Sequence, residues 1–151
     1  RVGLSNLDAE RKRTWELSGG QQQRVAIAAA LAIDPSVLLV DNATGMLDPT
    51  GQRRVGDILD DLAGETALVV VDDDPDFVAE RADRIATLAD GEIVARGETD
   101  RLLRDGEIHD TDGVEPPTPL WVARRAGLDD EPVTSDEFVA AVDGTQPADR
   151  S

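Results

Sequence analysis

The segment VLLVDNATGMLDP, residues 37–49, organises the middle of the chain. It opens with four apolar residues, a short run that is typical of a parallel strand buried on both faces. Asp48 and Pro49 then predict a helix start, because aspartate caps free backbone amides and proline fits the first helical position. Between strand and helix stands Asp41 followed by Asn42. Two carboxylates there would be suited to hold Mg²⁺ and activate water, but the second residue is an amide.

The residues after Pro49 extend this segment into a strand–helix–strand unit. Apolar residues at helical spacing lead to Gly64, and a second apolar run follows at residues 67–71. These elements predict a right-handed parallel crossover. Asp90–Gly91 separates two further short strands, RIATLA and EIVAR, and predicts a β-hairpin. Short helices are expected from Pro75 and over TDRLLR.

Upstream of this unit, Ser18 and Gln21 have the spacing of a capping box. The Ala-rich sequence that follows predicts a helix from about Gly19 to Asp34–Pro35. Its first turn leaves backbone N–H groups and the positive end of the helix dipole exposed, so it can receive a phosphate group.

The C-terminal third has a different composition. Residues 105–119 are rich in Asp, Gly and Pro and are expected to form a linker, in which His109 is solvated. Two short helices are predicted beyond it. In the first, a small core of Trp121 with Leu120 and Val122 is favoured over a ligand platform, and in the second Thr134 and Glu137 have the spacing of a capping box. The expected division is a main domain over 1–104, the linker 105–119, a helical tail over 120–142 and disorder over 143–151.

The composition narrows the classes of function. The formal net charge is −17, from 22 Asp and 10 Glu against 14 Arg and one Lys. Such a surface disfavours nucleic-acid binding and is best tolerated in high salt, so we expect a salt-loving source, with an ordinary acidic bacterial protein as the alternative. No apolar run approaches the roughly 18 residues of a membrane span, so a soluble chain is expected. The sequence has no cysteine, which excludes a disulfide framework and a thiolate metal site. The first residue, Arg1, suggests a fragment or a processed chain.

The order of motifs resembles one family. LSGGQ with Arg24 behind it, VLLVDNAT, GMLDP and the hairpin DRIATLADGEIVARG resemble the second half of an ATP-binding cassette (ABC) ATPase. The resemblance spans residues 1–104. Within the family, the Met-Leu-Asp-Pro loop and the tail motifs GVEPPTPLWVARRAGL and VTSDEFVAAV are similar to the ATPase components of energy-coupling factor importers. The resemblance implies an α/β, partial P-loop NTPase fold with buried parallel strands, packed helices and a C-terminal β-hairpin, followed by a small helical tail. It also implies ATP and Mg²⁺ as cofactors, and a head-to-tail pair of cassettes in which each LSGGQ faces the ATP held by the other.

Individual positions carry implied roles. Ser18, Gly19, Gly20 and Gln21 are implied to bind the γ-phosphate held by the opposite subunit. Asp41 is implied near the Mg²⁺ of this subunit's own site, and Asp48 at the contact with the partner. For Arg24, a helix-surface ion pair and a functional role both stay open.

Three departures from the family concern this subunit's own nucleotide site. The chain has no G-x-x-x-x-G-K-[ST] phosphate loop, which the family carries upstream of the resembling region. Asn42 takes the position of the catalytic Glu, and an amide cannot accept a proton from water at neutral pH. Asp73 takes the position of the switch His, where its charge opposes a phosphate. No catalytic residue is therefore intact, and we expect the degenerate half of an asymmetric ATPase pair, inactive by itself.

The expected partners are a second ABC ATPase subunit or half and a transmembrane transporter component, with no nucleic acid. The expected location is cytoplasmic, peripheral at the inner face of the cell membrane. A non-transport module that regulates another ATPase, and a decaying gene fragment, remain alternatives. For Asp72–Asp74, solvated acids are favoured over a cation site.

Overall fold

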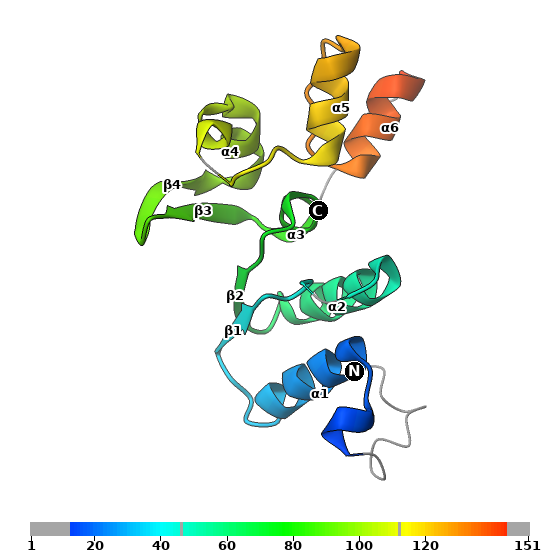
Figure 1. Cartoon of the computed structure of the whole chain (residues 1–151), viewed down its shortest axis with the longest axis vertical. Coiled ribbons are helices and arrows are strands. Elements are labelled where there is room, and N and C mark those ends of the chain that lie inside the picture. Colours follow the sequence, from blue (N-terminus) through cyan, green and yellow to red (C-terminus); the bar gives the residue numbers. More distant parts are fainter. Residues whose placement is uncertain (1–12, 46, 112, 145–151) are drawn as a thin grey trace. The chain divides into compact units, whose positions relative to one another are not determined.

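The computed structural model describes residues 13–45, 47–111 and 113–144. The chain divides into two compact units, Arg1–Asp73 and Asp74–Ser151, which are described separately here (Figure 1). The C-terminal residues that were expected to be disordered lie, from 145 on, outside the described part.

Unit 1 contains the predicted strand–helix–strand unit, preceded by the predicted helix. Its elements are η1 (Thr14–Glu16), α1 (Gly19–Leu31), β1 (Val37–Asp41), α2 (Pro49–Leu62) and β2 (Ala67–Val71). The two strands pair in parallel, from Val37 opposite Ala67 to Asp41 opposite Val71. The prediction of a parallel pair joined by a helix is confirmed.

Both predicted helix starts are confirmed at the level of hydrogen bonds. The backbone N–H of Gln21 donates to Ser18 Oγ at 3.4 Å, and Ser18 N–H donates to Gln21 Oε1 at 3.0 Å, which completes the capping box. Asp48 Oδ1 accepts from Gly51 N–H at 2.7 Å, with Pro49 at the first helical position. These bonds satisfy amides that the helix itself leaves free.

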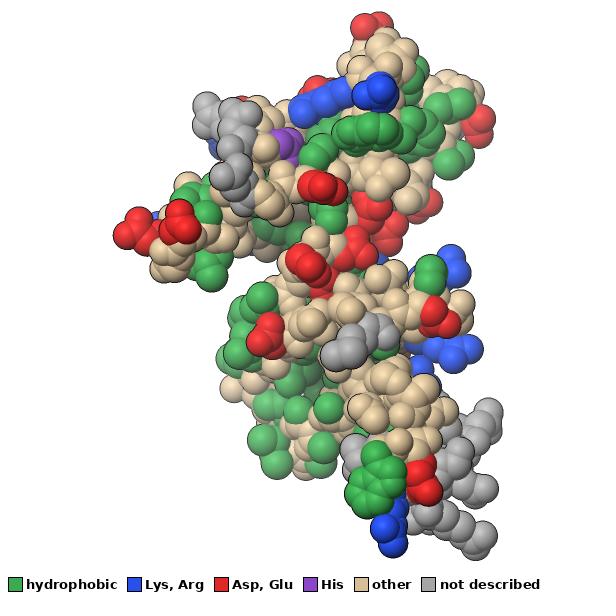
Figure 2. All heavy atoms as spheres, viewed as in Figure 1, with side chains coloured by type: hydrophobic (Ala, Val, Ile, Leu, Met, Phe, Trp, Pro, Cys, Tyr) green, Lys and Arg blue, Asp and Glu red, His purple; other side chains and the backbone are tan. Residues whose placement is uncertain are grey.

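The prediction that both strands are buried on both faces is wrong for the described chain. Burial alternates along β1, with Leu38 and Val40 buried, and α2 lies beside the strands in unit 1 (Figure 1). The other face is uncovered, and its four apolar side chains are between 49% and 66% exposed: Val37, Leu39, Val69 and Val71. Figure 2 shows apolar side chains gathered over these strands. The reason is that no described element packs against this second face.

Unit 2 is built on the predicted hairpin. Its elements are α3 (Pro75–Arg81), β3 (Arg84–Ala89), β4 (Glu92–Glu98), α4 (Thr99–Asp105), η2 (Glu107–Asp110), α5 (Thr118–Ala126) and α6 (Ser135–Asp143). β3 and β4 pair antiparallel through a turn with positive φ at Asp90 and Gly91, as the Asp-Gly pair predicts. A small core joins the helices and the sheet: Ala79, Leu103, Leu120 and Val133, with Ile85 packed against it.

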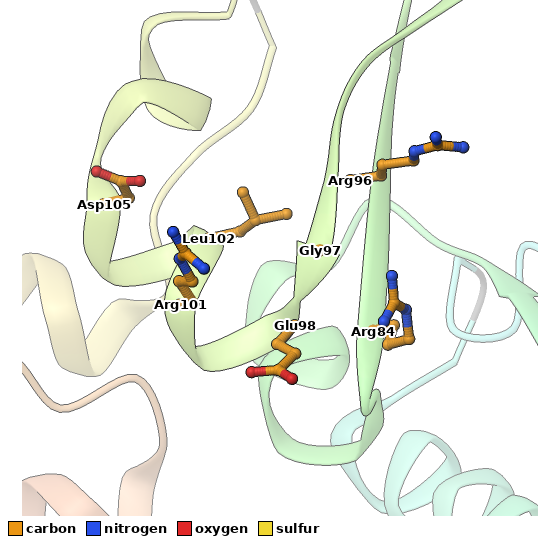
Figure 3. A pocket seen from close by; sticks show the side chains of 7 residues that line it. All are labelled: Arg84, Arg96, Gly97, Glu98, Arg101, Leu102 and Asp105. Atoms are coloured by element: carbon orange, nitrogen blue, oxygen red, sulfur yellow. The ribbon is translucent and has the colours of Figure 1, made fainter.

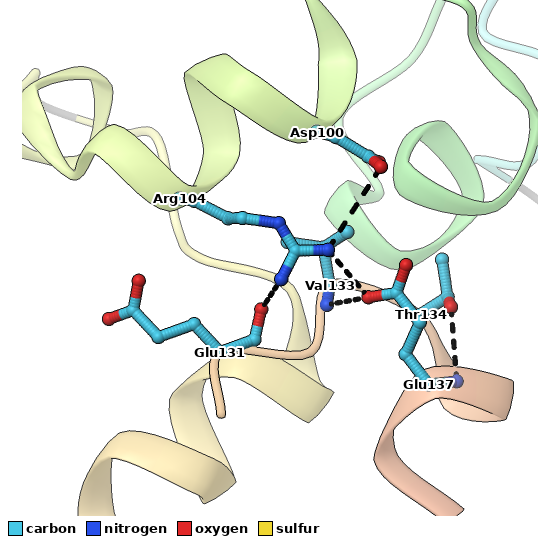
Figure 4. Close-up of polar contacts among 6 residues, drawn as sticks. All are labelled: Asp100, Arg104, Glu131, Val133, Thr134 and Glu137. Atoms are coloured by element: carbon cyan, nitrogen blue, oxygen red, sulfur yellow. Dashed lines mark hydrogen bonds and ion pairs between the residues drawn. The ribbon is translucent and has the colours of Figure 1, made fainter. Parts of the chain in front are cut away.

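The C-terminal helices are joined to α4 by polar contacts (Figure 4). The Arg104 guanidinium bonds Glu137 Oε2 at 2.9 Å and also the backbone carbonyl of Glu131. Thr134 Oγ1 accepts from Glu137 N–H, but the Glu137 carboxylate accepts from Val133 N–H at 2.9 Å. Only half of the predicted capping box forms here, because Glu137 pairs with Arg104 and Val133 instead.

Two expectations for single residues are wrong. His109 is not solvated: its Nε2 lies 2.9 Å from the Leu103 carbonyl oxygen, and its Nδ1 is buried. Trp121 is 51% exposed and stacks against the Arg125 guanidinium, whereas its neighbour Leu120 is fully buried. In both cases the position of the residue on a packed helical turn decided its burial, which composition does not reveal.

Candidate functional site: the LSGGQ segment and the loop after β1

The LSGGQ segment, Leu17–Gln21, ends at the open first turn of α1. Leu17 is buried and anchors the turn, while Ser18 and Gly19 are exposed. Ser18 Oγ accepts from Gln21 N–H, so its own hydroxyl hydrogen remains available to an outside acceptor. A hydroxyl, glycine backbone amides and the positive helix end together form a surface suited to a phosphate oxygen.

This turn lies against the segment that starts α2. A Cβ built on Gly20 would be 3.4 Å from Leu47 Cδ2, an ordinary contact distance. Leu47 also packs on Gly51, whose amide bonds Asp48. The structure thus brings the LSGGQ segment and the Leu47–Asp48 segment close together, although about 26 residues separate them in the sequence.

The carboxyl ends of β1 and β2 form one edge, which carries Asp41, Asn42 and the residues after Val71. Asn42 N–H donates to the Val71 carbonyl oxygen at 2.8 Å. Asp41 and Asn42 are both exposed. Asp41 and Asn42 therefore lie at the edge where parallel sheets commonly bind ligands.

Asn42 has an unusual backbone conformation with φ of 54°, in the left-handed region. Among non-glycine residues, asparagine tolerates this region best. Its side chain folds over Gly45: a Cβ built on Gly45 would be 1.8 Å from Asn42 Oδ1 and 2.5 Å from its Cγ. The amide is therefore held within its own loop. This contact gives a structural reason for an Asn at this position, in addition to the fact that the position lacks the catalytic carboxylate.

A second hydrogen-bonded pair joins this loop to the end of β2. Thr44, which is buried, donates to the Asp72 carboxylate from its backbone N–H at 2.8 Å and from its hydroxyl at 2.6 Å. Asp74 accepts from the first amides of α3, while Asp73 is exposed. Neither Asp72 nor Asp74 is merely solvated, and within the described ranges no three acidic, His or Cys side chains gather as a metal site.

Asp41 can supply one carboxylate to Mg²⁺, but not a complete protein-only site. Mg²⁺ is commonly held by one or two carboxylates together with substrate phosphates and water. Asp41 at the exposed strand end fits that minimal role. The remaining ligands would have to come from a nucleotide and from solvent.

Arg24 on α1 is 9% exposed. Its Nε has no hydrogen-bond partner among the described residues. A buried guanidinium nitrogen without a partner costs stability, which favours the open alternative of a role for Arg24 beyond the helix surface.

The chain is similar to known proteins of the ABC transporter family. The sequence model of the ABC transporter family matches residues 1–45. An energy-coupling factor transporter ATP-binding protein of Methanospirillum hungatei is 38% identical over 108 residues, covering 71% of this chain and 27% of the relative. A putative ABC transporter ATP-binding protein of Pyrococcus horikoshii is 36% identical over 163 residues, covering 90% of this chain and 57% of the relative. The dimeric structure of a bacterial ABC transporter cassette superimposes with a TM-score of 0.52 at 38% identity, covering 58% of this chain and 38% of that one.

The fold and the ordered motifs thus resemble part of the ABC ATPase fold, which is of the α/β, P-loop NTPase class. The chain belongs to the ABC transporter ATPase family as a partial chain, and its relatives include importer ATPases of the energy-coupling factor type. It spans between 27% and 57% of the length of the two curated relatives above. Among the described residues, no helix is both long and apolar enough to cross a bilayer.

Sequence reasoning did not find the structural roles of three residues that shape the site, Thr44, Gly45 and Asp72. Thr44 and Asp72 are 28 positions apart, and nothing local signals their pairing. Gly45 carried a weak signal, since a glycine often marks a place where another group approaches the backbone closely.

Proposed function

We propose that this chain is a partial ATP-binding subunit of an ABC importer, related to the energy-coupling factor type, which contributes its LSGGQ segment to the ATP site of a partner ATPase. The observation that carries this proposal is the intact first turn of α1. Ser18 and Gly19 are exposed there, and the capping box holds the turn in place without occupying the Ser18 hydroxyl hydrogen.

The chain's own nucleotide site is proposed to be inactive. The Asn42 side chain is folded over Gly45, and an amide cannot accept a proton from water at neutral pH. Asp73 would set a negative charge against a phosphate, which at about 4 Å costs on the order of 4 kcal/mol at an effective dielectric near 20. Asp41 is proposed to touch Mg²⁺ only if a nucleotide supplies the other ligands, because the sequence has no phosphate loop.

The uncovered face of β1 and β2 supports an assembled state. A two-stranded parallel pair is marginal by itself, and parallel sheets are normally covered on both faces. Val37, Leu39, Val69 and Val71 offer the apolar surface that further strands or helices of a cassette would bury. We propose Asp48 at the contact with a second ATPase subunit, and a cytoplasmic location beside a transmembrane component.

The test is the ATPase activity of this chain assembled with the cassette ATPase that co-purifies with it. Gly19→Asp should abolish turnover, because a carboxylate would meet the γ-phosphate. Loss of one transition-state donor costs about 3 to 4 kcal/mol, several hundred-fold in rate. Asn42→Glu should change little. Gly64→Asp is the matched control, since nothing lies within 4 Å of a Cβ at Gly64.

Full activity of Gly19→Asp would exclude the contribution of LSGGQ in trans. A severalfold gain from Asn42→Glu alone would show that this half has a working nucleotide site. Transport by the reconstituted complex separates an importer subunit from a regulatory module, which would change ATPase activity without supporting uptake.

A further inference from the structure

Asp72, the first of the three acidic residues after β2, has no part in the nucleotide site proposed above. Its carboxylate accepts two hydrogen bonds from Thr44 in the loop after β1. The Thr44 hydroxyl donates to Oδ1 at 2.6 Å, and the Thr44 backbone N–H donates to Oδ2 at 2.8 Å. Hydrogen bonds to an ionised acceptor are shorter and stronger than neutral ones, and Thr44 is only 2% exposed, so water cannot easily replace this acceptor. The end of β2 thus holds Thr44 at two points.

Thr44 is bonded in turn to Leu47 within the same loop. Its carbonyl oxygen accepts from the Leu47 N–H at 2.9 Å, which closes a turn. Another backbone bond, from the Asn42 N–H to the Val71 carbonyl oxygen at 2.8 Å, fixes the beginning of the loop to β2. The loop between β1 and α2 therefore takes its position from β2 as well as from the two elements that it connects.

Leu47 is the residue of this loop that lies against the LSGGQ segment. A Cβ built on Gly20 would be 3.4 Å from Leu47 Cδ2, so the first turn of α1 packs on this side chain. Leu47 is half-buried and also contacts Gly51 at the start of α2. A continuous series of contacts therefore runs from Asp72 through Thr44 and Leu47 to Gly20. A change at its first member should displace its last, because closely packed groups do not move independently.

We propose that Asp72 and Thr44 are positioning residues for the LSGGQ segment. Their bonds hold Leu47 in place, and Leu47 sets the position at which the first turn of α1 meets the γ-phosphate of the partner's ATP. This inference rests on the proposed function of the LSGGQ segment. Donors that stabilise a transition state have to be held within about 0.5 Å of the productive geometry by the residues around them. Asp72 and Thr44 act through the turn, and neither of them touches the phosphate.

The experiment measures kcat and KM for ATP with the full chain assembled with the cassette ATPase that co-purifies with it. Thr44→Val keeps the shape of threonine without the hydroxyl. It should lower kcat about tenfold and leave KM within about twofold, because the displaced contacts are those made in the transition state. Asp72→Ala removes both acceptors and should lower kcat at least as far. Thr44→Ser keeps both bonds and should retain most of the wild-type kcat.

Thr66→Val is the matched control for the loss of a buried threonine hydroxyl. Thr66 stands immediately before β2, at the end of the strand opposite to Asp72, and its hydroxyl donates to the Pro35 carbonyl oxygen at 3.3 Å. The variant loses a buried hydrogen bond without touching the loop after β1. Its kcat should equal that of the wild type.

A double-mutant cycle with Ser18 separates positioning from a general loss of stability. Ser18→Ala removes one donor that the turn presents, so it should lower kcat by itself. In that background Thr44→Val should reduce kcat by a clearly smaller factor than in the wild type. If the two losses multiply, Thr44 acts independently of the LSGGQ segment, and the inference is overturned while the proposed function stands. If Ser18→Ala leaves kcat unchanged, the proposed function fails and the positioning role fails with it.

Amide chemical shifts of the full chain give a second reading that requires neither nucleotide nor partner. Thr44→Val should move the signals of Gly20 and Gln21, whereas Thr66→Val should leave them in place. The reference is Gly97 in unit 2, which packs against Leu102 (Figure 3) and should move in neither variant. Unmoved Gly20 and Gln21 signals in Thr44→Val, or equal losses of kcat in Thr44→Val and Thr66→Val, would also overturn the inference.

Discussion

The contact between Asn42 and Gly45 gives a sharp test of why the loop after β1 carries an amide. The change is Gly45→Ala. The new Cβ would be 1.8 Å from Asn42 Oδ1, 2.5 Å from Cγ and 2.6 Å from Nδ2. Because Cγ is among the clashing atoms, the whole Asn42 side chain has to leave its position rather than rotate its tip.

The magnitude follows from two opposing terms. Overpacking of this kind costs about 1 to 3 kcal/mol. Gly45 has no positive φ, so alanine fits its backbone. The replacement then stabilises the folded protein by about 0.4 to 1 kcal/mol, because it lowers the conformational entropy of the unfolded chain. In the wild type the clash should dominate, with a net loss of about 1 to 2 kcal/mol. In an Asn42→Gly background, where φ of 54° is unstrained, the same change should stabilise the protein.

The assay is a double-mutant cycle of urea unfolding at fixed salt, with wild type, Gly45→Ala, Asn42→Gly and the double variant. The expected coupling free energy is about 1.5 to 3 kcal/mol. Gly64→Ala is the control and should be neutral or slightly stabilising, because its Cβ meets nothing. A coupling near zero, or a Gly45→Ala protein as stable as the wild type, would refute the packing of Asn42 on Gly45.

Three further predictions concern binding, salt and capping. The isolated chain should give near-baseline heat with Mg-ATP in calorimetry, because it has no phosphate loop, and micromolar affinity would contradict this. Its melting temperature by circular dichroism should rise by several degrees between 0.1 M and 1 M salt, because the screening length falls from about 10 Å to about 3 Å. An unchanged melting temperature would exclude carboxylate repulsion as a major contribution to its stability. Asp48→Ala should lower the free energy of unfolding by about 1 kcal/mol by removing the bond to Gly51 N–H, whereas Asp48→Asn should cost only a few tenths. If urea unfolding shows equal losses of the free energy of unfolding for the two variants, the cap is not the cause of the loss.

The sequence alone determined the elements and the family. The capping box of Ser18 and Gln21, the Asp48–Pro49 helix start and the Asp90–Gly91 turn all formed as predicted. Each depends on residues within about four positions of one another, so the bonds are available to the chain before any tertiary packing. The parallel pairing of the two strands followed from their apolar runs and the amphipathic helix between them.

Tertiary structure decided which side chains those elements bury and which partners they find. One face of β1 and β2 is bare, although the sequence pattern predicted burial on both sides, because burial depends on what packs against a strand. The bonds from Thr44 to Asp72 and from Arg104 to Glu137 each join residues about 30 positions apart, a distance at which sequence patterns carry no signal. Local chemistry starts helices and turns, whereas a site forms only when the packing of separate elements brings its residues within contact distance.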